Sequence, residues 1–155
     1  EIKDIFKNSG IKELDISGWS EMEIGDKLSL NNTFTDCSNL TSVYFNNYRT
    51  EGYFIFNNFL RNSMIQKFEF KNIYIGKELN ANSAFDGCST LKSLDFSYVN
   101  ISEDFNFENL SSKGEDIIFS NLNVNKNVKG SFQKNVSITN IIFNIFDNYY
   151  ILYSY

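Results

Sequence analysis

Two cysteines are the first residues in this chain whose type and spacing could do chemistry. Cys37 lies in "TFTDCSNLTSVYF" (33–45) and Cys88 lies in "AFDGCSTLKSLDF" (84–96). A pair of thiols could form a disulfide or supply a reactive nucleophile. The two stretches also match each other over their whole length, so the cysteines could instead hold one equivalent position in two copies of a structural unit.

Two carboxylates are the second candidate for chemistry. Glu69 and Asp95 occupy matching places in "KFEF" and "SLDF", and paired carboxylates are a device of acid–base catalysis. Lys67 and Lys71 flank Glu69, so we interpret this group as a solvated ladder of alternating charges. The acidic stretch "SEDFNFE" (102–108) lacks the residue spacing of a calcium-binding loop.

The composition excludes several classes of function. The 155 residues include no His, which removes the commonest general base and metal ligand. The net charge of −5 argues against nucleic acid, because phosphate binding needs clustered Lys and Arg. No apolar run approaches the length of a transmembrane helix. We therefore expect no catalytic residue, no cofactor, no metal, no nucleic-acid partner and no transmembrane segment.

Six copies of one pattern run along the chain. Each copy contains two apolar residues separated by one position, and successive copies begin 23 to 29 residues apart. A further apolar residue follows three positions later, and a second apolar arm recurs between the copies. The six pairs are Leu14/Ile16, Val43/Phe45, Phe68/Phe70, Leu94/Phe96, Ile117/Phe119 and Ile141/Phe143, and the arms are Leu28/Leu30, Phe54/Phe56, Leu79/Ala81 and Phe105/Phe107.

This pattern predicts the fold class. Alternation in "LDI", "VYF", "FEF" and "LDF" is typical of a strand with one buried face. A unit of this length cannot bury that face alone, whereas stacked copies form a continuous core. We predict a β-rich, leucine-rich-repeat-like solenoid, a right-handed stack of about six units with parallel strand ladders and little helix. It forms a single domain over 1–155, with units near 5–30, 31–55, 56–80, 81–105, 106–128 and 129–155, and we expect the chain to be a fragment of a longer protein.

The repeat also answers the cysteine question. The residue three positions before each pair is Leu or Ile, with Gly114 as the one exception. Three positions before that residue we find a column of small polar side chains: Asn8, Cys37, Asn62, Cys88, Ser111 and Asn135. Such a side chain can hydrogen-bond backbone groups that a tight turn leaves unpaired. Two rungs of parallel stacking would separate the cysteines by about 10 Å, which exceeds the ~7 Å limit for a disulfide. We predict two reduced, buried thiols.

With these columns in view, the copies resemble the BspA-like leucine-rich repeats, in particular the bacterial surface protein or mycoplasma lipoprotein type. That family's units read roughly F-x-G-C-x-S-L-x-x-L-D-L-S, and "AFDGCSTLKSLDFS", "TFTDCSNLTSVYFN" and "FKNSGIKELDIS" are similar to it. The resemblance implies an extracellular or cell-surface protein that mediates adhesion by binding a host or self surface protein. It brings no catalytic residues. The alternative is a structural subunit of a larger envelope or appendage assembly.

The outward side chains of the repeated strand form the candidate binding face. We expect Tyr44, Glu69, Asp95, Ile118 and Ile142 to project from it. Tyr44 is the preferred recognition residue, since a Tyr side chain supplies contact area at low entropic cost. Exposed Ile118 and Ile142 on adjacent rungs would mark a contact with a missing C-terminal segment or a partner site.

Overall fold

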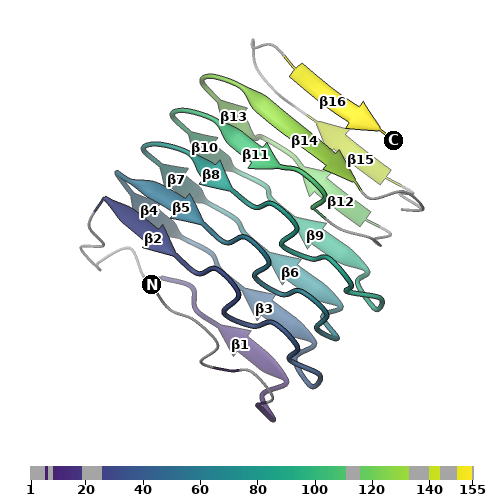
Figure 1. Ribbon diagram of the computed structural model, residues 1–155. Coiled ribbons are helices and arrows are strands. Elements are labelled where there is room, and N and C mark those ends of the chain that lie inside the picture. The colour runs from purple at the N-terminus through teal and green to yellow at the C-terminus, as the bar shows by residue number, and fades with distance from the viewer. Residues whose placement is uncertain are drawn as a thin grey trace.

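The computed structural model describes residues 6, 9–18, 26–110, 116–132, 140–143 and 150–154, and for 116, 132, 140–143 and 150–154 it describes the backbone. Within these ranges the chain forms short strands and no helix. The strands stack into three parallel sheets, as Figure 1 shows, and this arrangement is a parallel β-solenoid. The predicted β-rich solenoid with parallel strand ladders and little helix is confirmed, and its described part has four complete turns rather than about six units.

The first sheet contains one strand from every repeat copy. Its strands in spatial order are β1 (Glu13–Asp15), β3 (Ser42–Tyr44), β6 (Lys67–Glu69), β9 (Ser93–Asp95), β12 (Asp116–Phe119) and β15 (Asn140–Phe143). The register pairs Leu14 with Val43, Val43 with Phe68, Phe68 with Leu94, Leu94 with Ile117 and Ile117 with Ile141. The sequence pattern therefore predicted this ladder residue by residue.

Two further sheets complete each turn. The second sheet has the order β13 (Asn123–Val124), β10 (Val99–Ile101), β7 (Ile73–Ile75) and β4 (Tyr48–Thr50). The third has the order β16 (Tyr150–Ser154), β14 (Val128–Phe132), β11 (Phe105–Phe107), β8 (Leu79–Asn80), β5 (Tyr53–Ile55) and β2 (Lys27–Ser29). Among the described residues four turns carry all three strands, and the first and third sheets each continue by one strand at both ends.

Apolar side chains from all three sheets meet inside the solenoid. Aromatic rings dominate the middle of this core, where the Phe68 ring centroid lies 4.9 Å from that of Phe85 and 5.8 Å from that of Phe96. Near the C-terminal end, Phe107 stands opposite Gly130, and a Cβ atom at Gly130 would lie only 2.0 Å from the Phe107 ring. Close packing of this kind makes the core sensitive to volume changes.

Each turn of the solenoid bends at corners where the backbone has a positive φ. The corner between the first and second sheets repeats on five rungs, and the corner after the third sheet repeats on four. Asn and Gly tolerate this left-handed conformation better than other residues do. The two sets are Gly18, Asn47, Asn72, Tyr98 and Asn121, and Asn32, Asn58, Ser83 and Asn109.

We predict that the stability lost when a core residue of the first sheet is truncated depends on the position of that residue in the stack. Leu94 is fully buried between two neighbouring rungs, whereas Leu14 lies on the terminal strand β1 and is only partly buried. Leu94→Ala should lower the free energy of unfolding by about 2–5 kcal/mol through loss of apolar contact and creation of a cavity. Leu14→Ala, the same chemical change, should cost less than about 2 kcal/mol. Urea denaturation followed by circular dichroism measures both, and equal losses would contradict a one-dimensional stack.

Candidate binding surfaces

The outer face of the first sheet carries the predicted ladder of side chains. The register places Asp15 beside Tyr44, Tyr44 beside Glu69, Glu69 beside Asp95 and Asp95 beside Ile118. The backbone of Ile142 continues this ladder next to Ile118, and the Ile142 side chain lies outside the described residues. The structure thus brings the predicted face together in one row.

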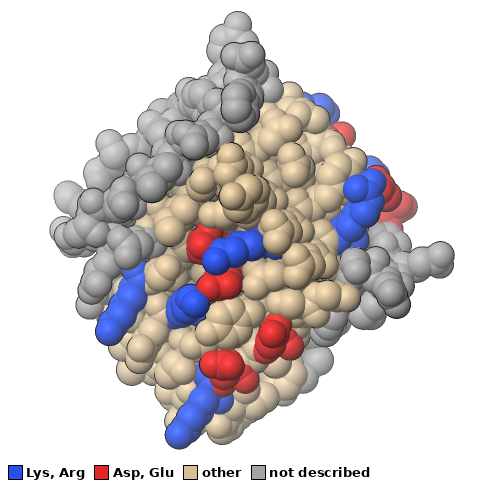
Figure 2. Space-filling view, turned by 180° about the vertical axis from the view of Figure 1, so that it is seen from behind, with Lys and Arg blue, Asp and Glu red and all other residues tan. Residues whose placement is uncertain are grey.

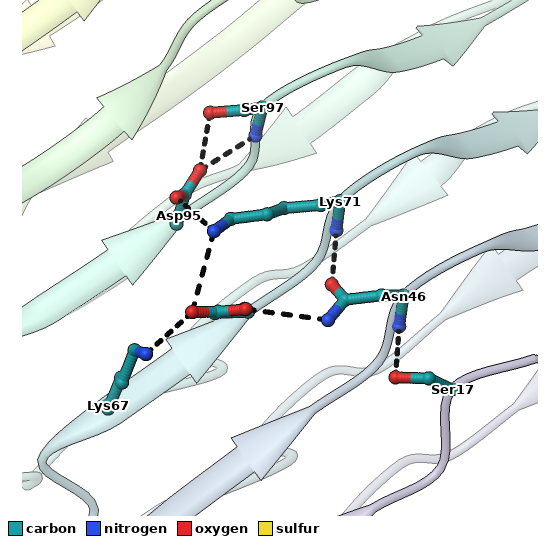
Figure 3. Close-up of polar contacts among 7 residues, drawn as sticks. Ser17, Asn46, Lys67, Lys71, Asp95 and Ser97 are labelled. Carbon is teal, nitrogen blue, oxygen red and sulfur yellow. Dashed lines mark hydrogen bonds and ion pairs between the residues drawn. The ribbon is translucent and has the colours of Figure 1, made fainter.

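Lysine side chains bridge the two carboxylates of this row. Lys71 Nζ lies 2.9 Å from Asp95 Oδ2 and 3.4 Å from Glu69 Oε1, and Lys67 Nζ lies 2.7 Å from the same Glu69 oxygen. Figure 3 shows how Lys71 links the two rungs and how Asn46 donates a hydrogen bond from its amide to Glu69. The carboxylates are only 16% and 15% exposed, so this charge ladder is partly buried rather than fully solvated.

The pKa shifts agree with this pairing. Burial acts to raise the pKa of Glu69, but the hydrogen bond from Lys67 and the charges of Lys71 and Lys67 outweigh it and leave the pKa below its usual value. Burial acts to lower the pKa of Lys71. The hydrogen bonds and negative charges of Asp95 and Glu69 outweigh this effect and leave the pKa of Lys71 above its usual value. Glu69 therefore stays a carboxylate near neutral pH, which suits an ion pair better than proton transfer.

Tyr44 and Ile118 flank the two carboxylates of the row on either side. The ammonium group of Lys67 lies 5.1 Å from the Tyr44 ring centroid, within the range of a cation–π contact. The Tyr44 side chain is partly exposed on the outer face. Ile118 is also half-buried rather than fully exposed, so it presents less apolar surface than the sequence predicted.

The acidic stretch 102–108 is also paired with lysines. Lys126 Nζ lies 3.3 Å from Glu103 Oε1, and Lys129 Nζ lies 2.6 Å from Glu108 Oε1. The structure contains no cluster of three or more potential metal ligands in the ranges it describes.

Both cysteines lie inside the solenoid as free thiols, as the repeat register predicted. Each thiol donates a hydrogen bond to a backbone carbonyl one rung away, from Cys37 to Phe6 at 3.0 Å and from Cys88 to Leu60 at 2.9 Å. The small polar side chain in this column thus satisfies a turn carbonyl. Burial raises the pKa of both thiols, for Cys88 to about 11, so they are poor nucleophiles at neutral pH.

The prediction is wrong for one position of the column that contains the two cysteines. Ser63, and not Asn62, lies between the two cysteines, with its hydroxyl 3.6 Å from the Cys88 sulfur. Asn62 instead lies next to Gly87 at a corner, and both have a positive φ. The reason is that the turn from Asn62 to Ile65 is one residue shorter than the equivalent turns of the neighbouring rungs.

The outer face of the second sheet is a second candidate surface that the sequence interpretation missed. Two adjoining hollows of about 510 and 440 Å³ lie along it and share Tyr98 and Asn100. Tyr98 is 57% exposed and has a φ of 59° at a corner position where three neighbouring rungs have Asn. The sequence could have indicated Tyr98, because aligning the repeats places it in the same column as Asn47 and Asn72, where a large aromatic residue is unusual.

Charged side chains gather locally on the molecule. Figure 2 shows one face from behind the view of Figure 1, with basic and acidic side chains interleaved near its centre and further charged side chains of both signs scattered towards its edges. Neither sign of charge dominates this face.

Comparisons with known proteins give no relative for this chain. No family model, no curated protein and no solved structure matches it. Over the described residues, no helix has the length and apolarity needed to cross a membrane.

We predict that the buried thiol of Cys88 makes stability pH-dependent under alkaline conditions. Because its folded pKa of about 11 exceeds the ordinary thiol value of 9.0, the unfolded state loses this proton first and stability falls as pH rises through the window from about 9 to 11. The loss should reach about 2–3 kcal/mol at the top of this window. The matched control is Cys88→Ser, because the preceding rung has a serine, Ser63, at this position. Urea denaturation at pH 8 and pH 11 should show a smaller pH effect in the variant, and an identical effect would contradict the assignment.

Proposed function

We propose that this chain is a non-catalytic binding module that acts in adhesion at a cell surface or outside the cell, and that its partner is a host or self surface protein. The resemblance of its units to BspA-like leucine-rich repeats supports this proposal. The groups with the greatest potential for chemistry have other roles, since the thiols are buried and the two carboxylates are held by lysines.

The single observation that carries the proposal is the row of outward side chains on the first sheet. These side chains project from strands whose backbone groups are already paired along the ladder, so the backbone that carries them is fixed. Ion pairs between Glu69, Lys71 and Asp95 further fix the centre of the row. A rigid face loses little conformational entropy on binding, which favours recognition of a protein surface.

Tyr44 is the proposed centre of recognition on this face. It combines an aromatic ring of low side-chain entropy with a hydroxyl group, and Lys67 orients the ring. Tyr53 offers a matched control on the third sheet, because it is also a half-buried strand Tyr with a lysine near its ring, at 4.9 Å from Lys77.

The test is binding of the whole chain to immobilised cell-surface and extracellular-matrix proteins, measured by surface plasmon resonance. Tyr44→Ala should weaken binding to the recognised protein at least about tenfold, as expected for a central interface residue. Tyr53→Ala should leave that binding unchanged.

Two outcomes would count against the proposal. If Tyr44→Ala binds as tightly as the unaltered chain, or if Tyr53→Ala loses as much affinity as Tyr44→Ala, the assignment of the binding site to the first sheet is wrong. If Ile118→Ser unfolds the protein while Tyr44→Ala binds normally, the face is structural, and a role as a subunit of a larger assembly becomes the better explanation.

A further inference from the structure

Tyr98 combines two unfavourable features at one position. A residue other than Gly in the left-handed region costs about 1–3 kcal/mol, and such strain gathers at functional sites. The same residue exposes 57% of its surface, more than any other large apolar side chain in the described part of the chain. Asn occupies the equivalent corner at Asn47, Asn72 and Asn121, so the fold itself does not require an aromatic residue there.

The surface next to Tyr98 is rich in amide groups. Asn100 and Asn123 are paired in register on adjacent strands, and both point outward between buried neighbours. Neither side chain hydrogen-bonds another protein group within the described ranges, so both can donate and accept hydrogen bonds. Their spacing follows the rung repeat of about 4.8 Å.

The hollow beside these amides carries balanced charge. Arg49 lies at its far end and pairs with Glu51 at 2.6 Å, and its guanidinium group sits 3.9 Å above the Tyr74 ring. The remaining lining residues are uncharged, mostly Asn and Tyr. A charged ligand would therefore find no unpaired opposite charge in this hollow.

We propose that the outer face of the second sheet binds a neutral oligosaccharide, with Tyr98 as the platform on which one sugar ring stacks. A sugar ring offers an apolar face that fits an aromatic side chain and hydroxyl groups that fit amides. The amides repeat at a distance comparable to one hexose unit, so successive units can meet successive rungs. The hollow volumes of about 510 and 440 Å³ fall within the range typical of small-molecule sites. This inference concerns a different sheet from the proposed protein-binding face and does not rest on it.

The test uses three neutral hexasaccharides, of β-1,4-linked glucose, N-acetylglucosamine and mannose, and the acidic hexasaccharide of galacturonic acid as comparator. Asn100 begins the sequence "NIS", which is an acceptor for N-linked glycosylation. The whole chain is therefore produced in a host that does not glycosylate, so that Asn100 stays unmodified. Calorimetry measures the affinities, and NMR follows the side-chain amide signals of Asn100 and Asn123.

Tyr98→Asn is the decisive variant. It introduces the residue found on the neighbouring rungs, so it should relieve backbone strain and leave the urea midpoint unchanged or higher. Binding of the neutral sugar should nevertheless fall at least about tenfold. Asn100→Ala, an exposed change in the middle of a strand, should also weaken binding, whereas Tyr44→Ala on the first sheet should not.

Several results would overturn the inference. They are the absence of binding by all three neutral sugars, equal binding by Tyr98→Asn, and binding of the acidic sugar as tight as that of the neutral ones. Loss of sugar binding in Tyr44→Ala would place the sugar on the first sheet and overturn it as well. Because the protein-partner assay uses Tyr44 and this assay uses Tyr98, failure of one proposal is distinguishable from failure of the other.

Discussion

Parallel strands that stack in register require each turn of the chain to return to the same position one rung further along, about 4.8 Å away. Short strands can meet this requirement only if the chain bends sharply between them. The bends need left-handed backbone, and Asn or Gly supplies it at most corners, as at Gly18, Asn47 and Asn72. The Asn side chains also form ladders of their own, such as the 3.1 Å hydrogen bond from Asn72 to Asn47.

This stacking separates interior from exterior chemistry. Side chains that point inward are packed against the rungs above and below, so a thiol such as that of Cys88 has no access to solvent and acts as a hydrogen-bond donor in the core. Side chains that point outward line up in rows, where opposite charges on adjacent rungs pair, as Lys71 does with Asp95. The proposed functions therefore rest on the outer faces, where the first and second sheets present different side chains.

The sequence predicted the ladders well because their signal is periodic. Val43, Phe68 and Leu94 repeat at nearly constant spacing, and the structure pairs them as expected. The turn at Ser63 was misaligned because its one-residue deletion leaves both flanking patterns intact. Tyr98 was missed because conformational strain at a corner does not change the periodicity of the residues around it.

Amide–amide nuclear Overhauser effects in deuterated protein test the in-register stacking of equivalent residues most directly. In-register stacking predicts cross-peaks between Val43 and Phe68 and between Phe68 and Leu94 in the first sheet. At the turn that differs from the sequence alignment, it predicts cross-peaks from Ser63 to Cys88. A pattern typical of antiparallel strands, or the absence of the cross-peaks between Val43, Phe68 and Leu94, would contradict the stacked solenoid, and cross-peaks from Cys88 to Asn62 with none to Ser63 would contradict the alignment of this turn.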